Sequence, residues 1–478
     1  MAVVTIEKFI EDFTKELRER NVAILAGAGM SVDAGFVNWK GLLKPLADEL
    51  KLDLEREHDL VKIAQYHVNH HGSNRNDLTN AILNGFSSKQ TKVTENHRIL
   101  ARLPIETYWT TNYDTTIEDA LRASGKSPDV KHDPKQLLQT LHGRSAIVYK
   151  MHGDVAHAND AVLCKADYET YHLSRADFLT ALAGDLLSKM FLFIGFSFSD
   201  PNLDYVLGRL HTRHGNHLRK HYCFVRREKR ETTDKEGEYR KAKQEYFICD
   251  LQRYNIRAVL VDEYAEIPTV LRRVEARYKS KTIFVSGAAH TYGEKITSDQ
   301  ALGFVHKLSK SLVKEKFRLV TGLGLGIGST VVDGALQQIY WEERRTIADE
   351  LVIRPFPQSS EGQKLWRAYR EDLLEFAGLA VFMFGNKIAG NPLAVVPSNG
   401  MVEEFNIAVS KGLRVLPLGF TGFVAMDLWK QVKADFGRFY PGASTRFKAL
   451  FEQLGDDEID LELQASAVVE ALQILQQM

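Results

Sequence analysis

The chain has 478 residues, more than a single hydrophobic core usually serves, so we expect two domains. Lysine plus arginine and aspartate plus glutamate both number 62, and this balance leaves no overall basic field to attract nucleic acid. No run of about 18 apolar residues is present, and residues 1–20 carry acidic side chains where a secretion signal needs an apolar core. We therefore expect a cytoplasmic protein that binds neither nucleic acid nor a membrane.

In the first part of the chain, a helix predicted over residues 5–20 is followed by short apolar runs separated by helical segments. These runs span residues 21–27, 105–112, 145–153, 190–198, 221–227 and 256–262. Strands that alternate with helices are typical of a parallel sheet covered by helices on both faces. We therefore predict an α/β domain.

A second series of apolar runs, again separated by helical segments, begins near residue 281. These runs span residues 281–289, 318–326, 350–358, 378–386 and 413–420. The pattern predicts a second, smaller α/β domain. Because a charged helix end at 274–281 leads into the first of these strands, we place the two domains at 1–278 and 279–478.

A glycine turn lies near the start of the chain, in the stretch "AILAGAGMS" at residues 23–31. A strand leads into Gly27, Ala28 and Gly29, and a helix is predicted to start at Ser31. Such a turn lets a diphosphate approach the free N–H groups of a helix N-terminus. The spacing departs from G-x-G-x-x-G because Val32 takes the third glycine position, so the loop alone also fits a simple strand-to-helix turn.

Polar side chains follow three further predicted strands. Asn112 and Asp114 follow one of them, and His152 and Asp154 follow the next. The third strand is followed by Gly195, Ser197, Asp200 and Asn202. Because ligands of open α/β sheets bind beyond the carboxyl ends of the strands, these clusters predict a site.

The first domain resembles the sirtuin family in "GAGMS", "TNYD", "KMHGD" and "GFSFSDPN". The resemblance implies that Asn112 holds the ribose and the attacking water and that His152 is the general base. Asp114 either contacts the ribose or caps the helix after it. The C-x-x-C zinc ribbon is missing and "GFVNW" stands in place of "GIPDFR", so the resemblance implies NAD binding more firmly than protein deacylation. The implied NAD-binding residues are Ala26, Gly27, Ala28, Gly29, Ser31, Asp114, Gly195, Ser197, Asp200 and Asn202.

Neither the cysteines nor the histidines predict a metal site. The three cysteines are far apart and form no C-x-x-C pair, which argues against a disulfide framework and a four-cysteine zinc site. His67, His70 and His71 have a helical spacing that suits a metal, but no nearby carboxylate completes the set. We therefore expect a solvated helix end at these histidines and no bound metal.

A second glycine run, "TGLGLGIGST" at residues 321–330, fits neither the dinucleotide pattern nor a P-loop. One interpretation is a strand with a glycine face that lets a helix pack closely. The other is a phosphate site at the N-terminus of a helix that starts at Ser329.

The strand ends around this run resemble the SLOG family of Rossmann-like domains, which bind nucleotide-derived ligands. "GMVEEFN" corresponds to the G-T-x-x-E element of the family, with methionine in place of threonine. Arg370 and Lys387 suit a diphosphate, and Glu404 suits a ribose hydroxyl pair. The implied ligand residues are Ser286, Gly287, Gly322, Gly324, Gly326, Gly328, Arg370, Lys387 and Glu404.

A sirtuin-like domain followed by a SLOG domain resembles the layout of the Thoeris anti-phage NADases. This resemblance implies a homotetramer that hydrolyses NAD+ to ADP-ribose and nicotinamide. It also implies activation by a cyclic ADP-ribose isomer made by a TIR-domain partner protein and bound by the SLOG domain. The alternatives are an NAD-dependent deacylase or ADP-ribosyltransferase, a non-catalytic nucleotide sensor, and a phosphoribohydrolase site in the second domain.

Overall fold

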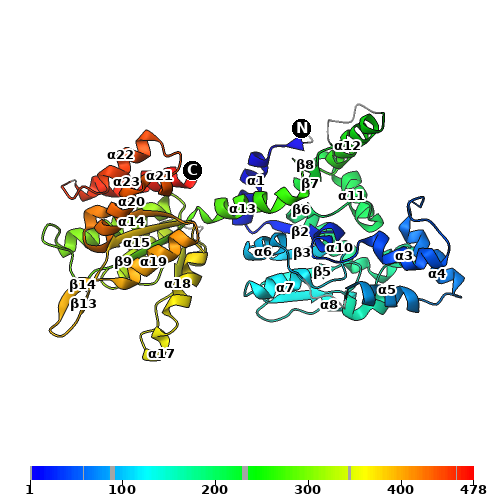
Figure 1. The fold of residues 1–478 in the computed structure, drawn as a ribbon, viewed down its shortest axis with the longest axis horizontal. Helices are drawn as coiled ribbons and strands as arrows, with labels where there is room; N and C mark the ends of the chain where they lie inside the picture. Colours follow the sequence, from blue (N-terminus) through cyan, green and yellow to red (C-terminus); the bar gives the residue numbers. More distant parts are fainter. Residues whose placement is uncertain (1–2, 58, 87–91, 229–234, 343–345, 459) are drawn as a thin grey trace. The chain divides into compact units, whose positions relative to one another are not determined.

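The computed structural model describes residues 3–57, 59–86, 92–228, 235–342, 346–458 and 460–478 (Figure 1). The chain forms two compact units, Met1–Glu275 and Ala276–Met478. The boundary between them falls inside helix α13 (Ile267–Lys279), the same helix that contains the predicted boundary after residue 278.

Unit 1 is built around an eight-stranded sheet in the order β1-β8-β7-β6-β2-β3-β5-β4, in which every pairing is parallel. Its strands are β1 (Val3–Val4), β2 (Val22–Ala26), β3 (Thr107–Thr110), β4 (Pro128–Lys131), β5 (Ala146–Lys150), β6 (Met190–Ile194), β7 (His221–Arg226) and β8 (Ile256–Val261). The chain runs from β2 to β3 on one side and later returns to β6 on the other. The strand order therefore reverses between β2 and β6, where ligands of such sheets bind.

Helices cover both faces of this sheet, and alternate strand residues reach opposite faces. In β3, the Trp109 indole N–H donates to Asp185 on α10 (Ala176–Ser188), whereas the Tyr108 hydroxyl donates to the Leu100 carbonyl on α6 (Glu95–Arg102). The helices of unit 1 are α1 (Ile6–Arg18), α2 (Ala28–Val32), α3 (Trp39–Glu49), α4 (Leu60–His70), α5 (Asn76–Phe86), α6 (Glu95–Arg102), α7 (Thr116–Ala123), α8 (Pro134–Leu137), α9 (Lys165–Ser174), α10 (Ala176–Ser188), α11 (Pro201–His214) and α12 (Lys235–Arg253).

Unit 2 has a five-stranded parallel sheet in the order β11-β10-β9-β12-β15 and an antiparallel hairpin of β13 and β14. Its strands are β9 (Thr282–Ala288), β10 (Arg318–Thr321), β11 (Leu351–Ile353), β12 (Leu379–Phe384), β13 (Asn386–Ala389), β14 (Ala394–Pro397) and β15 (Arg414–Pro417). Its helices are α14 (Ser298–Lys314), α15 (Gly328–Trp341), α16 (Ile347–Glu350), α17 (Ser360–Gln363), α18 (Trp366–Glu375), α19 (Asn399–Ser410), α20 (Phe423–Ala434), α21 (Phe436–Phe439), α22 (Thr445–Gln453) and α23 (Leu461–Gln477).

These units confirm the predicted α/β class, and each predicted apolar run contains a strand of the corresponding sheet. The prediction missed β1, β4 and the β13–β14 hairpin. In the ranges that the structure describes, no helix combines the length and apolar character that crossing a bilayer requires.

Candidate functional site

A pocket of about 960 Å³ opens at the carboxyl end of the unit 1 sheet, beside the point where the strand order reverses. It is lined by seven of the residues predicted for catalysis or cofactor binding: Gly27, Ala28, Gly29, His152, Gly195, Ser197 and Asp200. The first residues of α3 and α4 and the side chain of Tyr168 form other parts of its wall. The size of the pocket suits a dinucleotide-sized ligand.

The glycine turn after β2 packs directly against the turn after β6. The Gly29 N–H donates to the Gly195 carbonyl at 2.9 Å, and the Gly27 N–H donates to the Ile194 carbonyl at 3.0 Å. A Cβ on Gly27 would lie 2.5 Å from the Gly195 oxygen, so a side chain at this position would push the two turns apart. The glycines therefore hold the floor of the pocket together, whatever ligand it takes.

Asn112 and Asp114 lie behind this floor and do not line the pocket. The Asn112 amide nitrogen donates to the Gly27 carbonyl at 2.9 Å and to the Ser31 hydroxyl at 2.8 Å. The Ser31 hydroxyl donates in turn to Asp114 at 2.5 Å, and Asp114 also accepts the Thr116 N–H at 3.0 Å. Asp114 precedes Thr115, the N-cap residue of α7, and its bond to the Thr116 N–H lies at the start of that helix. Contact with the ribose, the other role expected for Asp114, stays a prediction.

The remaining predicted cofactor residues, Ala26 and Asn202, are also buried outside the pocket lining. Ala26 is the last residue of β2, and Asn202 lies in the first turn of α11. The Asn202 amide nitrogen has no hydrogen-bond partner among the described residues. The direct contact with a cofactor expected for these two residues stays a prediction.

His152 faces a carboxylate inside the pocket. Its Nε2 lies 3.0 Å from Oδ2 of Asp200, and the Tyr168 ring meets its edge at a centroid distance of 5.5 Å. The other Asp200 oxygen accepts the Leu203 N–H at 2.9 Å and so caps α11. Burial raises the pKa of Asp200, but His152 and the backbone N–H groups outweigh it and hold that pKa below its ordinary value. An ionised Asp200 is therefore placed to orient His152 and to stabilise its protonated form.

A buried ammonium group, missed in the sequence, joins the two strand ends that carry Asn112 and His152. Lys150 is fully buried at the end of β5, and its Nζ donates to the carbonyls of Tyr113 and Asp114 at 3.1 and 2.7 Å. It also pairs with Glu118 at 3.1 Å and with Asp154. The signal in the sequence is a lysine at the end of an apolar strand with an aspartate four residues later.

In unit 2, the structure brings Ser286, Arg370 and Glu404 together. The Ser286 hydroxyl donates to Glu404 at 2.6 Å, and the Arg370 Nε donates to the other Glu404 oxygen at 3.4 Å. Burial raises the pKa of Glu404, although Ser286 and Arg370 oppose the shift. Arg370 also pairs at 2.7 Å with Glu403, a residue that the sequence reasoning did not single out.

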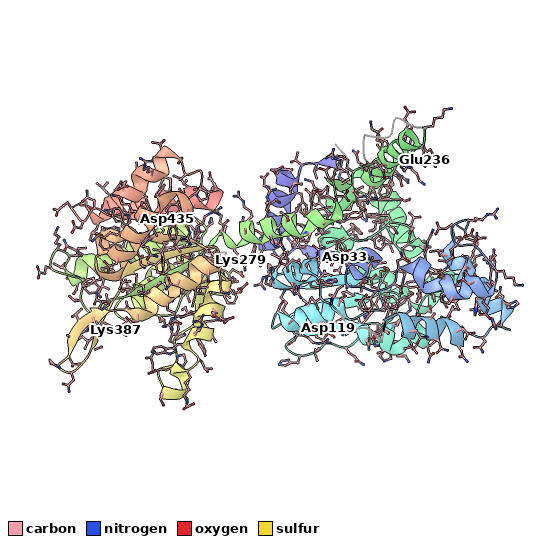
Figure 2. The ribbon with its side chains drawn as sticks, viewed as in Figure 1. Asp33, Asp119, Glu236, Lys279, Lys387 and Asp435 are labelled. Atoms are coloured by element: carbon pink, nitrogen blue, oxygen red, sulfur yellow. The ribbon has the colours of Figure 1, made fainter. Side chains whose placement is uncertain are left out.

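Lys387 lies on the β13–β14 hairpin and is half-buried (Figure 2). Within the described ranges, no hydrogen bond or ion pair joins Lys387 to the group formed by Ser286, Arg370 and Glu404. Its predicted role at a diphosphate therefore stays a prediction.

The second glycine run forms a loop between β10 and α15, so the interpretation as a strand with a glycine face is wrong, because β10 ends at Thr321. This loop lies on the end of β9, where a Cβ on Gly324 would stand 1.8 Å from the Gly287 oxygen. The Ala289 N–H donates to the Leu325 carbonyl at 2.8 Å across the same contact. Close packing therefore requires glycine at this point of the run, and phosphate binding at the start of α15 stays a prediction.

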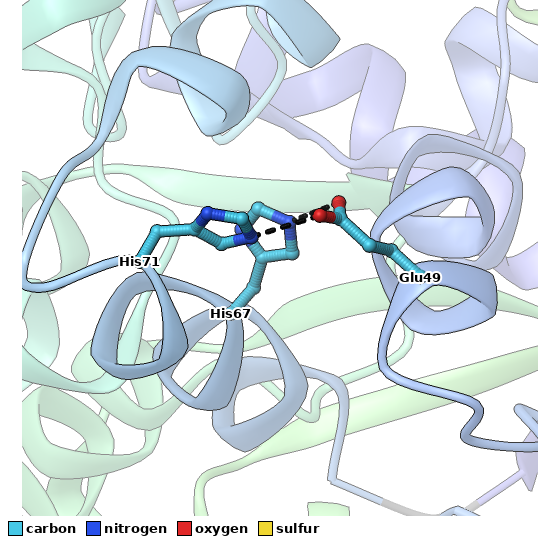
Figure 3. A group of neighbouring side chains, drawn as sticks. All are labelled: Glu49, His67 and His71. Atoms are coloured by element: carbon cyan, nitrogen blue, oxygen red, sulfur yellow. Dashed lines mark hydrogen bonds and ion pairs between the residues drawn. The ribbon is translucent and has the colours of Figure 1, made fainter.

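The expectation of a solvated helix end at the three histidines is wrong for His67 and His71. His67 is fully buried and His71 half-buried, while His70 is exposed as expected. The missing carboxylate comes from another helix: Glu49, the last residue of α3, lies 2.8 Å from Nε2 of His67 and 2.9 Å from Nε2 of His71 (Figure 3). Helix packing, which local spacing does not reveal, supplies this group.

Comparison with known proteins agrees with the two units. Residues 106–251 match the SIR2-like domain, and residues 266–475 match the Sir2- and TIR-associating SLOG family. The chain is 46% identical over 472 residues to the NAD(+) hydrolase ThsA of Bacillus cereus (strain MSX-D12), covering 98% of both chains. The chain belongs to the ThsA family. A second member, from Acinetobacter baumannii (strain 532279), is 44% identical over 462 residues, which cover 94% of this chain and 95% of the relative.

Membership in the ThsA family confirms the predicted order of a sirtuin-like domain followed by a SLOG domain. It also identifies the domain type in which the pocket lies and the one that contains the group of Ser286, Arg370 and Glu404. The pocket lies in the sirtuin-like unit, and that group lies in the SLOG unit.

Proposed function

We propose that this chain hydrolyses NAD+ to ADP-ribose and nicotinamide in the pocket of unit 1. The observation that carries the proposal is the pair of His152 and Asp200 inside a pocket bounded by the glycine turn after β2. The ThsA relatives from Bacillus cereus and Acinetobacter baumannii are NAD(+) hydrolases by name, which supports the same reaction. The proposed hydrolysis requires no metal in this pocket.

The chemistry needs little beyond orientation and one base. The bond between the nicotinamide nitrogen and C1′ of the ribose breaks with its electron pair going to the nicotinamide, which leaves neutral. The oxygen of a water molecule bonds to C1′, and the proton that it releases goes to His152, which Asp200 stabilises in its charged form. We assign Asn112 a positioning role, because its hydrogen bond to the Gly27 carbonyl holds the glycine turn that bounds the pocket. The direct contact with ribose and water that the sirtuin resemblance implies for Asn112 stays a prediction.

The test of this reaction is nicotinamide release from NAD+ by the purified chain without any acceptor peptide or protein. We expect equal amounts of nicotinamide and ADP-ribose, because water is the acceptor. Strict dependence on an acylated or ADP-ribosylatable acceptor would instead establish the deacylase or transferase alternative. If no NAD+ is hydrolysed with or without the activating ligand, the non-catalytic nucleotide sensor is the alternative that remains.

We propose further that unit 2 binds a cyclic ADP-ribose isomer made by a TIR-domain partner and that this ligand activates the hydrolase. Arg370 offers a planar fork for a phosphate, and Glu404 offers acceptors for ribose hydroxyls. Both are buried and already hydrogen-bonded, so the group is preorganised. In the same scheme, the chain works in the cytoplasm as a homotetramer and depletes NAD+ during phage infection, as its resemblance to the Thoeris NADases supports.

Changing Arg370 to alanine is expected to raise the concentration of cyclic ADP-ribose isomer needed for half-maximal activation by about 10- to 100-fold. The reason is the loss of a charge-assisted contact to the ligand phosphate. Binding of the isomer is measured by calorimetry beside NAD+ turnover. Arg367→Ala, on the exposed side of α18, is the control and keeps wild-type activation. Equal activation of both variants would contradict the assignment.

A further inference from the structure

Glu49 at the end of α3, His67 on α4 and His71 directly after α4 form a compact group (Figure 3). Their three ligand atoms, one from each side chain, lie within 4.8 Å of one another. The two histidines are spaced by four residues, so their rings lie together on one side of the helical turn, tilted by 30° at a centroid distance of 4.4 Å. Both rings present Nε2 to the same carboxylate.

The polar atoms of this group are poorly satisfied by the protein alone. Nδ1 of His67 is buried and has no hydrogen-bond partner among the described residues. Nε2 of His71 is also buried and, although it lies 2.9 Å from Glu49, it completes no hydrogen bond there. A buried imidazole nitrogen without a partner is costly unless another group uses it, and of these two atoms Nε2 of His71 is the one that faces the group.

We propose that Glu49, His67 and His71 bind a divalent transition-metal ion of the zinc class. Two imidazole nitrogens and one carboxylate oxygen are a ligand set that Zn²⁺ accepts, with a fourth position open to water. Two ligand atoms of a tetrahedral zinc site lie about 3.4 Å apart, given bond lengths near ~2.1 Å. The present separations of 2.8 and 2.9 Å from the carboxylate are about half an ångström shorter.

The ion has an entry path, and the ligands can adjust to it. The side chain of Glu49 is 49% exposed and that of His71 is 32% exposed, whereas that of His67 is fully buried. The carboxylate can therefore shift toward solvent while the buried ring stays in place. Because only three protein ligands are present and Nδ1 of His67 lacks an acceptor, we expect a dissociation constant of about micromolar rather than that of a closed four-ligand site.

Such an ion would be structural rather than catalytic. None of its three ligands lines the pocket, but the first residues of the helices that carry them do, including Trp39 of α3 and Leu60 of α4. The metal would tie together the parts of these two helices that lie about 10–15 Å along the helix axis from the pocket wall. The proposal does not rest on NAD+ hydrolysis, since metal binding is measured without NAD+.

The test is a titration of ZnCl₂ into the EDTA-treated full chain by isothermal calorimetry. The variants are Glu49→Gln, which keeps the shape of the side chain, and His71→Ala. His70→Ala is the control, because His70 lies beside the group on the same helix and faces solvent. We expect saturable binding of one zinc ion in the wild type and in His70→Ala, and affinity at least tenfold lower in the other two variants.

A second readout is the melting temperature. Zinc is expected to raise it in the wild type and in His70→Ala but not in His71→Ala, because a ligand stabilises only the state that binds it. Circular dichroism without zinc checks that every variant is folded. No saturable binding by the wild type, or equal affinity in all the chains, would overturn the proposal.

Discussion

Changing His152 to alanine is expected to lower NAD+ hydrolysis by about 10²- to 10⁴-fold, the usual contribution of a positioned general base. His152 is 2% exposed, lines the pocket and lies 3.0 Å from an ionised carboxylate, so its removal deletes the proton acceptor and leaves the glycine turn intact. The measurement is nicotinamide release at saturating NAD+ and activator.

A milder change at the partner of His152 tests the role of the charge separately. Asp200→Asn keeps the shape of the partner and its cap of α11 but removes the charge that stabilises protonated His152. We expect a smaller loss of turnover than in His152→Ala, because the imidazole base stays in place and only the charge that supports its protonated form is removed.

The control for both variants is His157→Ala. His157 is exposed, lies five residues from His152 and stacks on His132 rather than facing the pocket. It should keep wild-type turnover. Undiminished hydrolysis by folded His152→Ala would remove this residue from the mechanism, and a loss in His157→Ala equal to that in His152→Ala would show that the region had merely been disturbed.

The sequence is enough to predict the parts of the fold whose pattern is local. Central strands such as β2 and β6 are buried on both faces, so each reads as a continuous apolar run. The edge strands are different. β1 has two residues, and β4 has the sequence PDVK with alternating burial, so neither stands out from a loop.

The residues of the candidate site likewise divide into those that a local pattern predicts and those that depend on tertiary packing. The glycine turn and His152 follow strands directly, and the rule that ligands bind at strand ends identifies them. His152 and Asp200 lie far apart in the sequence and meet only in the folded structure, so no local spacing pattern predicts their pairing. The carboxylate of Glu49 beside His67 was missed for the same reason, since it depends on how α3 packs on α4.

Changing Lys150 to methionine is expected to lower the free energy of unfolding of unit 1 by about 3–5 kcal/mol, the usual effect of breaking a buried ion pair. Methionine fills much of the same space but donates no hydrogen bond. Glu118, which is 2% exposed, then loses its cation, and the carbonyls of Tyr113 and Asp114 lose their donor. Chemical denaturation followed by circular dichroism measures the change.

The effect of Lys150→Met should depend on pH in a direction that separates charge from packing. Burial already raises the pKa of Glu118, and Lys150 lowers it, so removing the lysine raises that pKa further. A carboxyl whose folded pKa lies above its unfolded value costs nothing while protonated and destabilises the fold as the pH rises through that range. The difference in stability from the wild type should therefore be smaller at pH 5 than at pH 8.

Two further variants complete this test. Lys150→Met combined with Glu118→Gln removes the stranded charge and should recover part of the lost stability, because the two residues are in direct contact. Lys44→Met breaks a pair with Asp48 that is exposed on both sides, and it should change little. A loss in Lys150→Met that is equal at both pH values and unrelieved by Glu118→Gln would mean that packing, rather than the buried charge, joins the strand ends that carry Asn112 and His152.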